Sequence, residues 1–186
     1  MTRLVPLLLL VAACGTPPTF QPVCRQGDVV VYTSDCASPE IIKWPLPIRV
    51  GLEPSLADYS DSLDMAINRW NGAVSKRLFL RVDGPGDVNV SLGPVRKGIA
   101  GSVSHVYTGD VLSASVQLHG VADITVAYHV LTHELGHVVG LAHDKRPTSI
   151  MHESLDTSGI MGGEELPMYL IGSEDSAALE KLYSGQ

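Results

Sequence analysis

Three histidines, a glutamate and a glycine stand at set intervals in the middle of the chain, as His133, Glu134, His137, Gly140 and His143. On a helix, residues four positions apart lie on one face, so the first two histidines can reach one metal ion. Glycine enters the left-handed conformation at little steric cost, so Gly140 can end the helix and let the chain return His143 as a third ligand. Three protein nitrogens with a fourth position open is the arrangement of a catalytic zinc ion, because a structural site is closed by protein groups.

Glu134 follows the first histidine directly, where its carboxylate can meet a water on the metal rather than the metal itself. The alternative interpretation is a buried helix whose histidines are simply packed in the core. That alternative requires the glycine and the third histidine to fall in register by chance, so the spacing favours the metal site.

The string His-Glu-x-x-His-x-x-Gly-x-x-His, followed by Met151, resembles the signature of the metzincin zinc proteases. The distance to the methionine resembles the matrixin branch of that group. The resemblance covers about residues 44–184 and is strongest at residues 131–151. It implies that Met151 binds no metal and forms a floor, the Met-turn, beneath the three imidazoles.

From this resemblance we expect a zinc-dependent endopeptidase in which Glu134 is the general base for a metal-activated water. We expect a protein or peptide substrate to bind as an extended strand on the edge offered by residues 101–107. The alternative is a non-catalytic zinc-binding surface lipoprotein that uses a protease-like fold for adhesion, and Glu134 argues against it because binding alone has no evident need for this carboxylate.

One catalytic zinc ion is the expected cofactor. His105 and His119 invite comparison with the second, structural zinc of matrixins, but the His-x-Asp and glycine-rich patterns that accompany it are missing. Calcium is compatible with the resemblance, yet no motif supports it. His129 lies one turn before His133, and we interpret it as a packed side chain rather than a further ligand.

Hydrophobic periodicity and turn residues predict an α+β domain, a twisted mixed five-stranded sheet with an active-site helix, a Met-turn and a C-terminal helix. Asp123 is the expected N-cap of the active-site helix. The expected strands are 48–52, 78–82, 88–92, 101–107 and 114–118, and the expected helices are 55–74, 124–139 and 173–183.

The chain has 186 residues with 20 acidic and 13 basic side chains, a net charge of −7, and no basic cluster. This composition allows one domain with a substantial core and argues against nucleic-acid binding.

Residues 1–13 have the short apolar run of a signal peptide, and Cys14 follows small residues as in a bacterial lipobox. We therefore expect an exported lipoprotein anchored to a membrane at Cys14, facing the periplasm or the cell exterior; an ordinary secretory signal is the alternative. Residues 14–42 would form a lipidated tether with a small loop closed by a Cys24–Cys36 disulfide, and residues 43–186 the protease domain.

After Met151 the sequence departs from matrixins, which carry a proline two residues later where this chain has Glu153. The segment 152–170 contains several apolar side chains and neither lysine nor arginine. If it lines the specificity pocket, we expect preference for a medium or large apolar residue after the cleaved bond.

Overall fold

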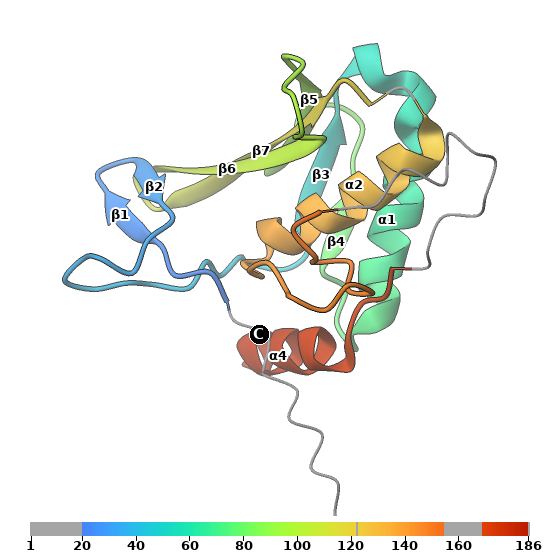
Figure 1. Ribbon diagram of the computed structural model, residues 1–186. Coiled ribbons are helices and arrows are strands. Elements are labelled where there is room, and N and C mark those ends of the chain that lie inside the picture. The colour runs from blue at the N-terminus through green and yellow to red at the C-terminus, as the bar shows by residue number, and fades with distance from the viewer. Residues whose placement is uncertain (1–19, 122, 155–168, 186) are drawn as a thin grey trace, which may run out of the picture.

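The computed structural model describes residues 20–121, 123–154 and 169–185 (Figure 1). The predicted signal peptide, the predicted lipidation site Cys14 and most of the predicted pocket segment (residues 155–168) lie outside the described residues. Among the described residues, no helix combines the length and the apolar character needed to cross a membrane.

A mixed seven-stranded sheet organises the chain, in the spatial order β1-β2-β6-β7-β5-β3-β4. Strands β4, β3, β5 and β7 run parallel to one another, whereas β6 pairs antiparallel with both β7 and β2, and β1 pairs antiparallel with β2. The strands are β1 (Cys24–Gln26), β2 (Val29–Val31), β3 (Ile48–Leu52), β4 (Phe79–Arg81), β5 (Val88–Gly93), β6 (Gly101–Thr108) and β7 (Val111–His119).

The sheet has two strands more than the five predicted, because the N-terminal segment forms a hairpin that joins it. β1 and β2 pair with each other, and Val29 of β2 pairs with Val106 of β6. A disulfide between Cys24 and Cys36 closes the loop that contains this hairpin, as the cysteine pair predicted. Short strands with mostly exposed side chains carry little hydrophobic alternation, so the sequence pattern did not reveal them.

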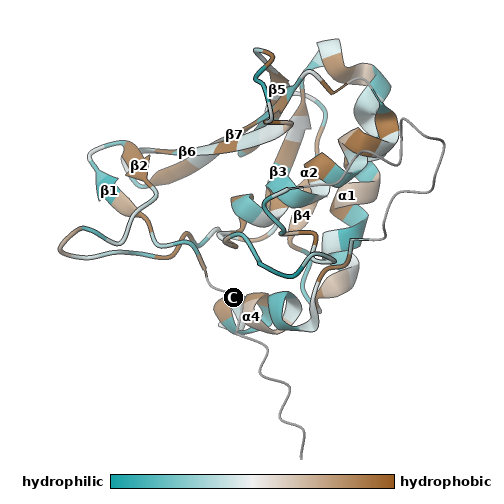
Figure 2. Ribbon diagram, viewed as in Figure 1, coloured by the Kyte–Doolittle hydropathy of each residue, from teal (hydrophilic) through white to brown (hydrophobic). Residues whose placement is uncertain are grey.

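Two helices, α1 (Ser60–Ala73) and α2 (Ile124–Val138), pack against each other and against the sheet. In Figure 2, hydrophobic residues alternate with hydrophilic ones along both helices, as expected for helices with one buried side. Trp70 of α1 is fully buried and donates its indole N–H to the carbonyl oxygen of Thr132, 2.7 Å away. It is a core residue, as its helical spacing predicted.

The helix predicted at residues 55–74 is divided in the structure. Its first part is a 3₁₀ helix, η1 (Pro54–Tyr59), in which Leu56 has a non-helical backbone (φ −105°, ψ 21°). The kink at Leu56 lets this side chain reach the core, and the regular helix begins only at Ser60.

The C-terminal helix α4 (Ser173–Tyr183) lies below the loop that carries His143 in Figure 1. Arg146 of that loop connects the two, because its guanidinium pairs with Asp144 beside it and with Glu174 at the start of α4 (2.7 Å). Leu179 and Tyr183 of α4 are buried in the core. The helix therefore supports the loop of the third histidine from outside.

Candidate metal centre and cleft

Helix α2 starts where the sequence predicts, because Asp123 caps it. The Asp123 carboxylate accepts hydrogen bonds from the backbone N–H groups of Thr125 (2.7 Å) and Val126 (3.0 Å), and these bonds lower the pKa of Asp123. The cap satisfies N–H groups that have no partner within the helix. It fixes the first turn, from which the histidines follow at helical spacing.

The helix ends at Val138, and the predicted glycine, Gly140, makes the reversal that follows it. Gly140 has φ +89°. Its N–H donates to the carbonyl oxygen of His137 at 2.9 Å, and the N–H of Leu141 donates to the carbonyl oxygen of Gly136 at 3.0 Å. This pair of bonds is the Schellman motif, which requires a left-handed residue after the helix. The reversal brings His143 back towards the helix it has just left.

The three imidazoles converge on one point, with ligand atoms all within 4.8 Å of one another. The Nε2 atom of His137 lies 3.0 Å from that of His133 and 3.2 Å from that of His143. Tetrahedral zinc with Zn–N bonds of 2.0–2.1 Å separates its ligand nitrogens by about 3.3 Å. The spacing of the three nitrogens therefore fits a zinc ion.

Backbone carbonyls fix which nitrogen of each helical histidine is bare. The Nδ1 of His133 donates to the carbonyl oxygen of Ile150, and the Nδ1 of His137 to that of Leu141, both at 2.7 Å. A neutral imidazole has one N–H, so the two Nε2 atoms face each other as lone pairs. Bare nitrogens in contact repel each other, and a cation between them would remove the repulsion.

Burial keeps these imidazoles neutral, which is the form that binds metal. It lowers the pKa of His133 to about 4 and that of His137 to about 3, and it also lowers the pKa of the more exposed His143. All three are therefore available as ligands at neutral pH.

Glu134 is 5% exposed and its carboxylate makes no hydrogen bond or ion pair with any described residue. Burial raises the pKa of Glu134 to about 8. A divalent cation at the three imidazoles would favour the charged carboxylate and lower this pKa again. The carboxyl group of Glu134 is thus buried beside the metal centre and free to accept or donate a proton there.

Gly101, the first residue of β6, lets the sheet edge approach Glu134. A Cβ atom at this position would lie 2.5 Å from Oε1 and 2.8 Å from Cγ of Glu134, and 2.6 Å from Cγ1 of Val130. Any other residue would have to displace the carboxylate. The role of Gly101 is not visible in the sequence, since a glycine at the start of a strand carries no signal of its own.

Met151 is completely buried and its sulfur lies against Gly136, between the two helical histidines. A Cβ atom at position 136 would come within 2.3 Å of the sulfur and 2.9 Å of the Trp70 ring. The methionine therefore packs against α2 at the turn that carries His133 and His137, and the resemblance predicts a Met-turn at this residue.

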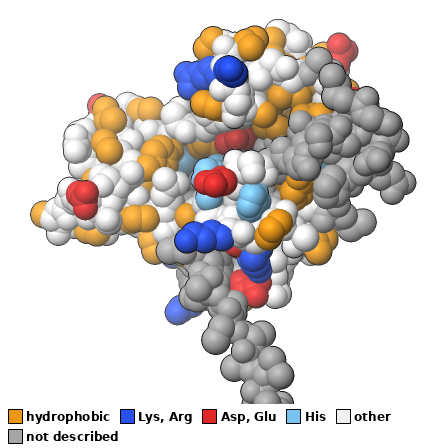
Figure 3. Space-filling view, in the orientation of Figure 1, with side chains coloured by type: hydrophobic (Ala, Val, Ile, Leu, Met, Phe, Trp, Pro, Cys, Tyr) orange, Lys and Arg blue, Asp and Glu red, His pale blue; other side chains and the backbone are white. Residues whose placement is uncertain are grey.

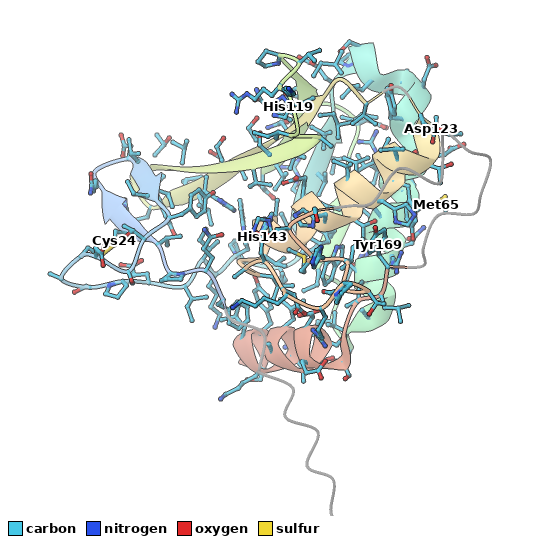
Figure 4. The ribbon with its side chains drawn as sticks, in the orientation of Figure 1. Cys24, Met65, His119, Asp123, His143 and Tyr169 are labelled. Atoms are coloured by element: carbon cyan, nitrogen blue, oxygen red, sulfur yellow. A yellow bond between two sulfur atoms is a disulfide. The ribbon has the colours of Figure 1, made fainter. Side chains whose placement is uncertain are left out.

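A cleft of about 1100 Å³ runs past the metal centre and is lined by all three histidines, Glu134 and the start of β6. Figure 3 shows histidine side chains (pale blue) in a hollow at the centre of this face. His143 lies near the middle of the molecule in Figure 4, and His119 lies towards the upper end of the sheet.

The other histidines that the sequence singled out have partners apart from the metal centre. His105 accepts from Tyr32 and donates to the carbonyl of Val138, and His119 contacts Ser102 Oγ and the carbonyl of Pro94, each at 2.8 Å. His129 is buried between the rings of Tyr128 and Tyr169, as the packed interpretation predicted.

A metal-dependent peptidase requires nitrogen ligands around one point, a carboxylate free to act beside them and a cleft for the substrate, and this chain has all three. By class the chain is a zinc metalloprotease. It belongs to the matrixin family, whose model matches residues 59–184.

Two solved structures have similar folds. Myroilysin is 14% identical in sequence, with a TM-score of 0.45 over 77% of this chain and 83% of that one. High choriolytic enzyme 1, a hatching enzyme zinc-protease from Oryzias latipes (medaka fish), is 15% identical, with a TM-score of 0.47 over 75% of this chain and 90% of that one.

Proposed function

We propose that the protein is a zinc-dependent endopeptidase that hydrolyses peptide bonds with Glu134 as its general base. The observation that carries the proposal is the Glu134 carboxylate, which is buried beside three converging Nε2 atoms and unused by any described residue. A site for holding metal alone gains nothing from an unpaired buried carboxyl group, which is costly to bury.

His133, His137 and His143 would hold the zinc ion. When bound, zinc supplies a Lewis acid that polarises the scissile carbonyl and lowers the pKa of water from 15.7 to about 7. Glu134 would accept the proton of the attacking water and deliver it to the departing amine. The hydrogen bonds to Ile150 and Leu141 keep the two helical imidazoles in the tautomer and orientation that ligation needs.

The free edge of β6 supports binding of the substrate as an extended strand. Ala100 turns its carbonyl towards β7, where it accepts from His119, and Tyr107 turns its N–H away from β7 to the carbonyl of Asp28. Since strand residues alternate, Gly101, Val103 and His105 also direct their backbone groups away from β7, towards the cleft. Within the described chain, residues 101–105 have no strand partner on this side.

Main-chain hydrogen bonds along this edge would give affinity with little demand on substrate sequence. The residue after the cleaved bond would then be selected by a pocket. We retain the sequence-based expectation of an apolar preference there, from the segment that lies mostly outside the described residues.

The decisive experiment incubates the purified protein with a diverse peptide library and maps the products by mass spectrometry. Cleavage should stop with a chelator, return with zinc, and be at least ~100-fold slower in Glu134→Gln, while Glu53→Gln, outside the cleft lining, should cleave normally. Cleavage at the wild-type rate in the Glu134 variant, or a zinc-loaded protein that cuts no peptide, would contradict the proposal.

We also propose that the protein is exported and anchored to a membrane by lipid on Cys14. The support is the apolar run that ends in small residues before this cysteine. Mass spectrometry of the protein from its native membrane fraction should find a lipidated Cys14 at the N-terminus. An unmodified N-terminus beyond Cys14 would overturn the proposal.

A further inference from the structure

The β1–β2 hairpin precedes the residues that match the matrixin family, and it pairs with the same edge of β6 that is free nearer to Glu134. β2 pairs with β6 at Val29 and Val106, and among the described residues no strand pairs with this edge of β6 from Gly101 to His105. In Figure 1 the hairpin covers the end of β6 that lies farthest from β5. A peptide strand added along the free edge would therefore run towards β2.

The hairpin is held in place at several points. The disulfide between Cys24 and Cys36 closes the hairpin loop on itself, and Arg25 attaches the hairpin to β6 by stacking over the ring of Tyr107 at 4.3 Å. The N–H of Gln21 bonds to the carbonyl of Gly140 at 2.9 Å, so the segment before the hairpin is tied to the turn that ends α2. The hairpin is thus a fixed wall rather than a free arm.

Tyr32 follows β2 and lines the cleft together with Phe20, Gln21 and Pro22. Its hydroxyl contacts Nδ1 of His105 at 2.5 Å, and Nε2 of His105 lies 3.2 Å from the carbonyl oxygen of Val138. A carbonyl can only accept, so Nε2 carries the proton of the neutral ring and Nδ1 is bare. The Tyr32 hydroxyl must therefore donate to His105.

Because its proton is committed to His105, the Tyr32 oxygen can offer only a lone pair to the cleft. Burial raises the pKa of Tyr32 to about 12, so the hydroxyl stays protonated at neutral pH. The side chain is 38% exposed. The Tyr32 oxygen can therefore accept a hydrogen bond from a bound peptide. In an extended peptide the donor is a main-chain N–H.

The direction of the peptide follows from the sheet. Both neighbours of β6 are antiparallel to it, and antiparallel strand pairs are commoner than parallel ones. A peptide that pairs with β6 on the same side as β2 therefore also runs antiparallel to β6. Its N-terminal side then points at the hairpin. From Gly101, beside Glu134, to His105 there are four steps of about 3.4 Å each, or ~14 Å of edge.

We propose that the disulfide-closed hairpin ends the substrate cleft on the N-terminal side of the cleaved bond, and that Tyr32 positions the peptide there by accepting a main-chain hydrogen bond. This inference rests on the proposed peptidase activity. It assigns a substrate class, peptides that place about four residues before the cleaved bond in the cleft, and it assigns a specificity role to a segment outside the residues that match the family.

The test uses acetylated peptides that share one sequence after the cleaved bond and carry one to eight residues before it. For the wild-type protein, kcat/KM should rise up to about four residues and then stay level. Tyr32→Phe should equal wild type on the shortest peptides and be about three- to tenfold slower on those of four residues or more, the range of one neutral hydrogen bond. Tyr128→Phe is the matched control, since Tyr128 lies outside the cleft lining and its hydroxyl accepts one hydrogen bond from Arg69 (2.7 Å), and it should behave as wild type at every length.

A second arm replaces single peptide N–H groups before the cleaved bond by ester oxygens. One replacement should slow the wild-type protein by the same factor as Tyr32→Phe and should have no effect in that variant, as a double-mutant cycle requires. Equal rates for wild type and Tyr32→Phe at every length, or an equal loss at every length, would overturn the inference. A wild-type protein that cleaves none of the peptides with zinc would instead refute the proposed function.

Discussion

The Nδ1 of His133 donates a hydrogen bond to the carbonyl oxygen of Ile150, 2.7 Å away, and so joins the first metal ligand to the residue before Met151. Ile150 is itself held by a bond from its N–H to the carbonyl of Leu170 at 2.8 Å. The turn at Ile150 and Met151 therefore orients the His133 imidazole through its backbone, while the Met151 side chain packs against Gly136. Packing at Met151 and metal affinity should be coupled for this reason.

Met151→Ala should lower the free energy of unfolding by about 2–5 kcal/mol and weaken zinc binding, because it leaves a cavity beneath α2. Met151→Leu keeps most of the volume and should lose less than about 1.5 kcal/mol. Met65→Ala is the control, since Met65 is 55% exposed. Denaturant titrations and zinc competition assays measure both quantities, and unchanged zinc affinity in Met151→Ala would disprove the coupling.

Glu134 and His143 should divide the work at the metal centre. Glu134→Gln should retain near-stoichiometric zinc and lose at least ~100-fold in kcat, the lower range for general acid–base catalysis. His143→Ala should weaken zinc binding, because it removes one of three ligands. Metal analysis and steady-state kinetics distinguish the two, and loss of zinc from the Glu134 variant would show that this carboxylate is a ligand.

Gly101→Ala should reduce activity without removing zinc. The added methyl group would meet the Glu134 carboxylate and Val130, so the flexible glutamate side chain must move. We expect at least a tenfold loss in kcat, since a small misplacement of a catalytic group can cost ~100-fold. Ser104→Ala on the same strand is the control. If Gly101→Ala has wild-type activity, the position of Glu134 does not depend on this contact.

His105 should make stability depend on pH. Burial lowers the pKa of His105 from 6.5 to about 4, so the unfolded chain takes up this proton more readily than the folded one. The contribution of neutral His105 to the free energy of unfolding is on the order of 3 kcal/mol. It is complete above pH 6.5 and is lost as the pH falls towards 4.

The comparison is His105→Asn against wild type, both with chelator present so that bound metal does not change the titration of the ligand histidines. The variant should be less stable at pH 7 because it loses the packed ring, and its free energy of unfolding should fall less between pH 6.5 and 4. Chemical denaturation at several pH values measures this. Identical pH dependence in the two proteins would exclude His105 as the cause.

The sequence alone determined the parts of the site that depend on local spacing. Asp123, the histidines of α2 and Gly140 lie within one helix and its two ends, where helical geometry fixes their relations. The zinc chemistry and the family followed from that stretch. The expected strands and the C-terminal helix appeared within a few residues of their predicted bounds, because their hydrophobic periodicity is strong.

Only the tertiary structure decided which distant residues surround this helix. Tyr32 and His105 are 73 positions apart, and Gly101 of β6 lies directly against Glu134 of α2. The two added strands are short, a disulfide closes the loop that contains them, and their place beside β6 is fixed by pairing at Val106. Contacts of this kind depend on how complete surfaces fit together, and neither residue type nor spacing in a single sequence encodes that fit.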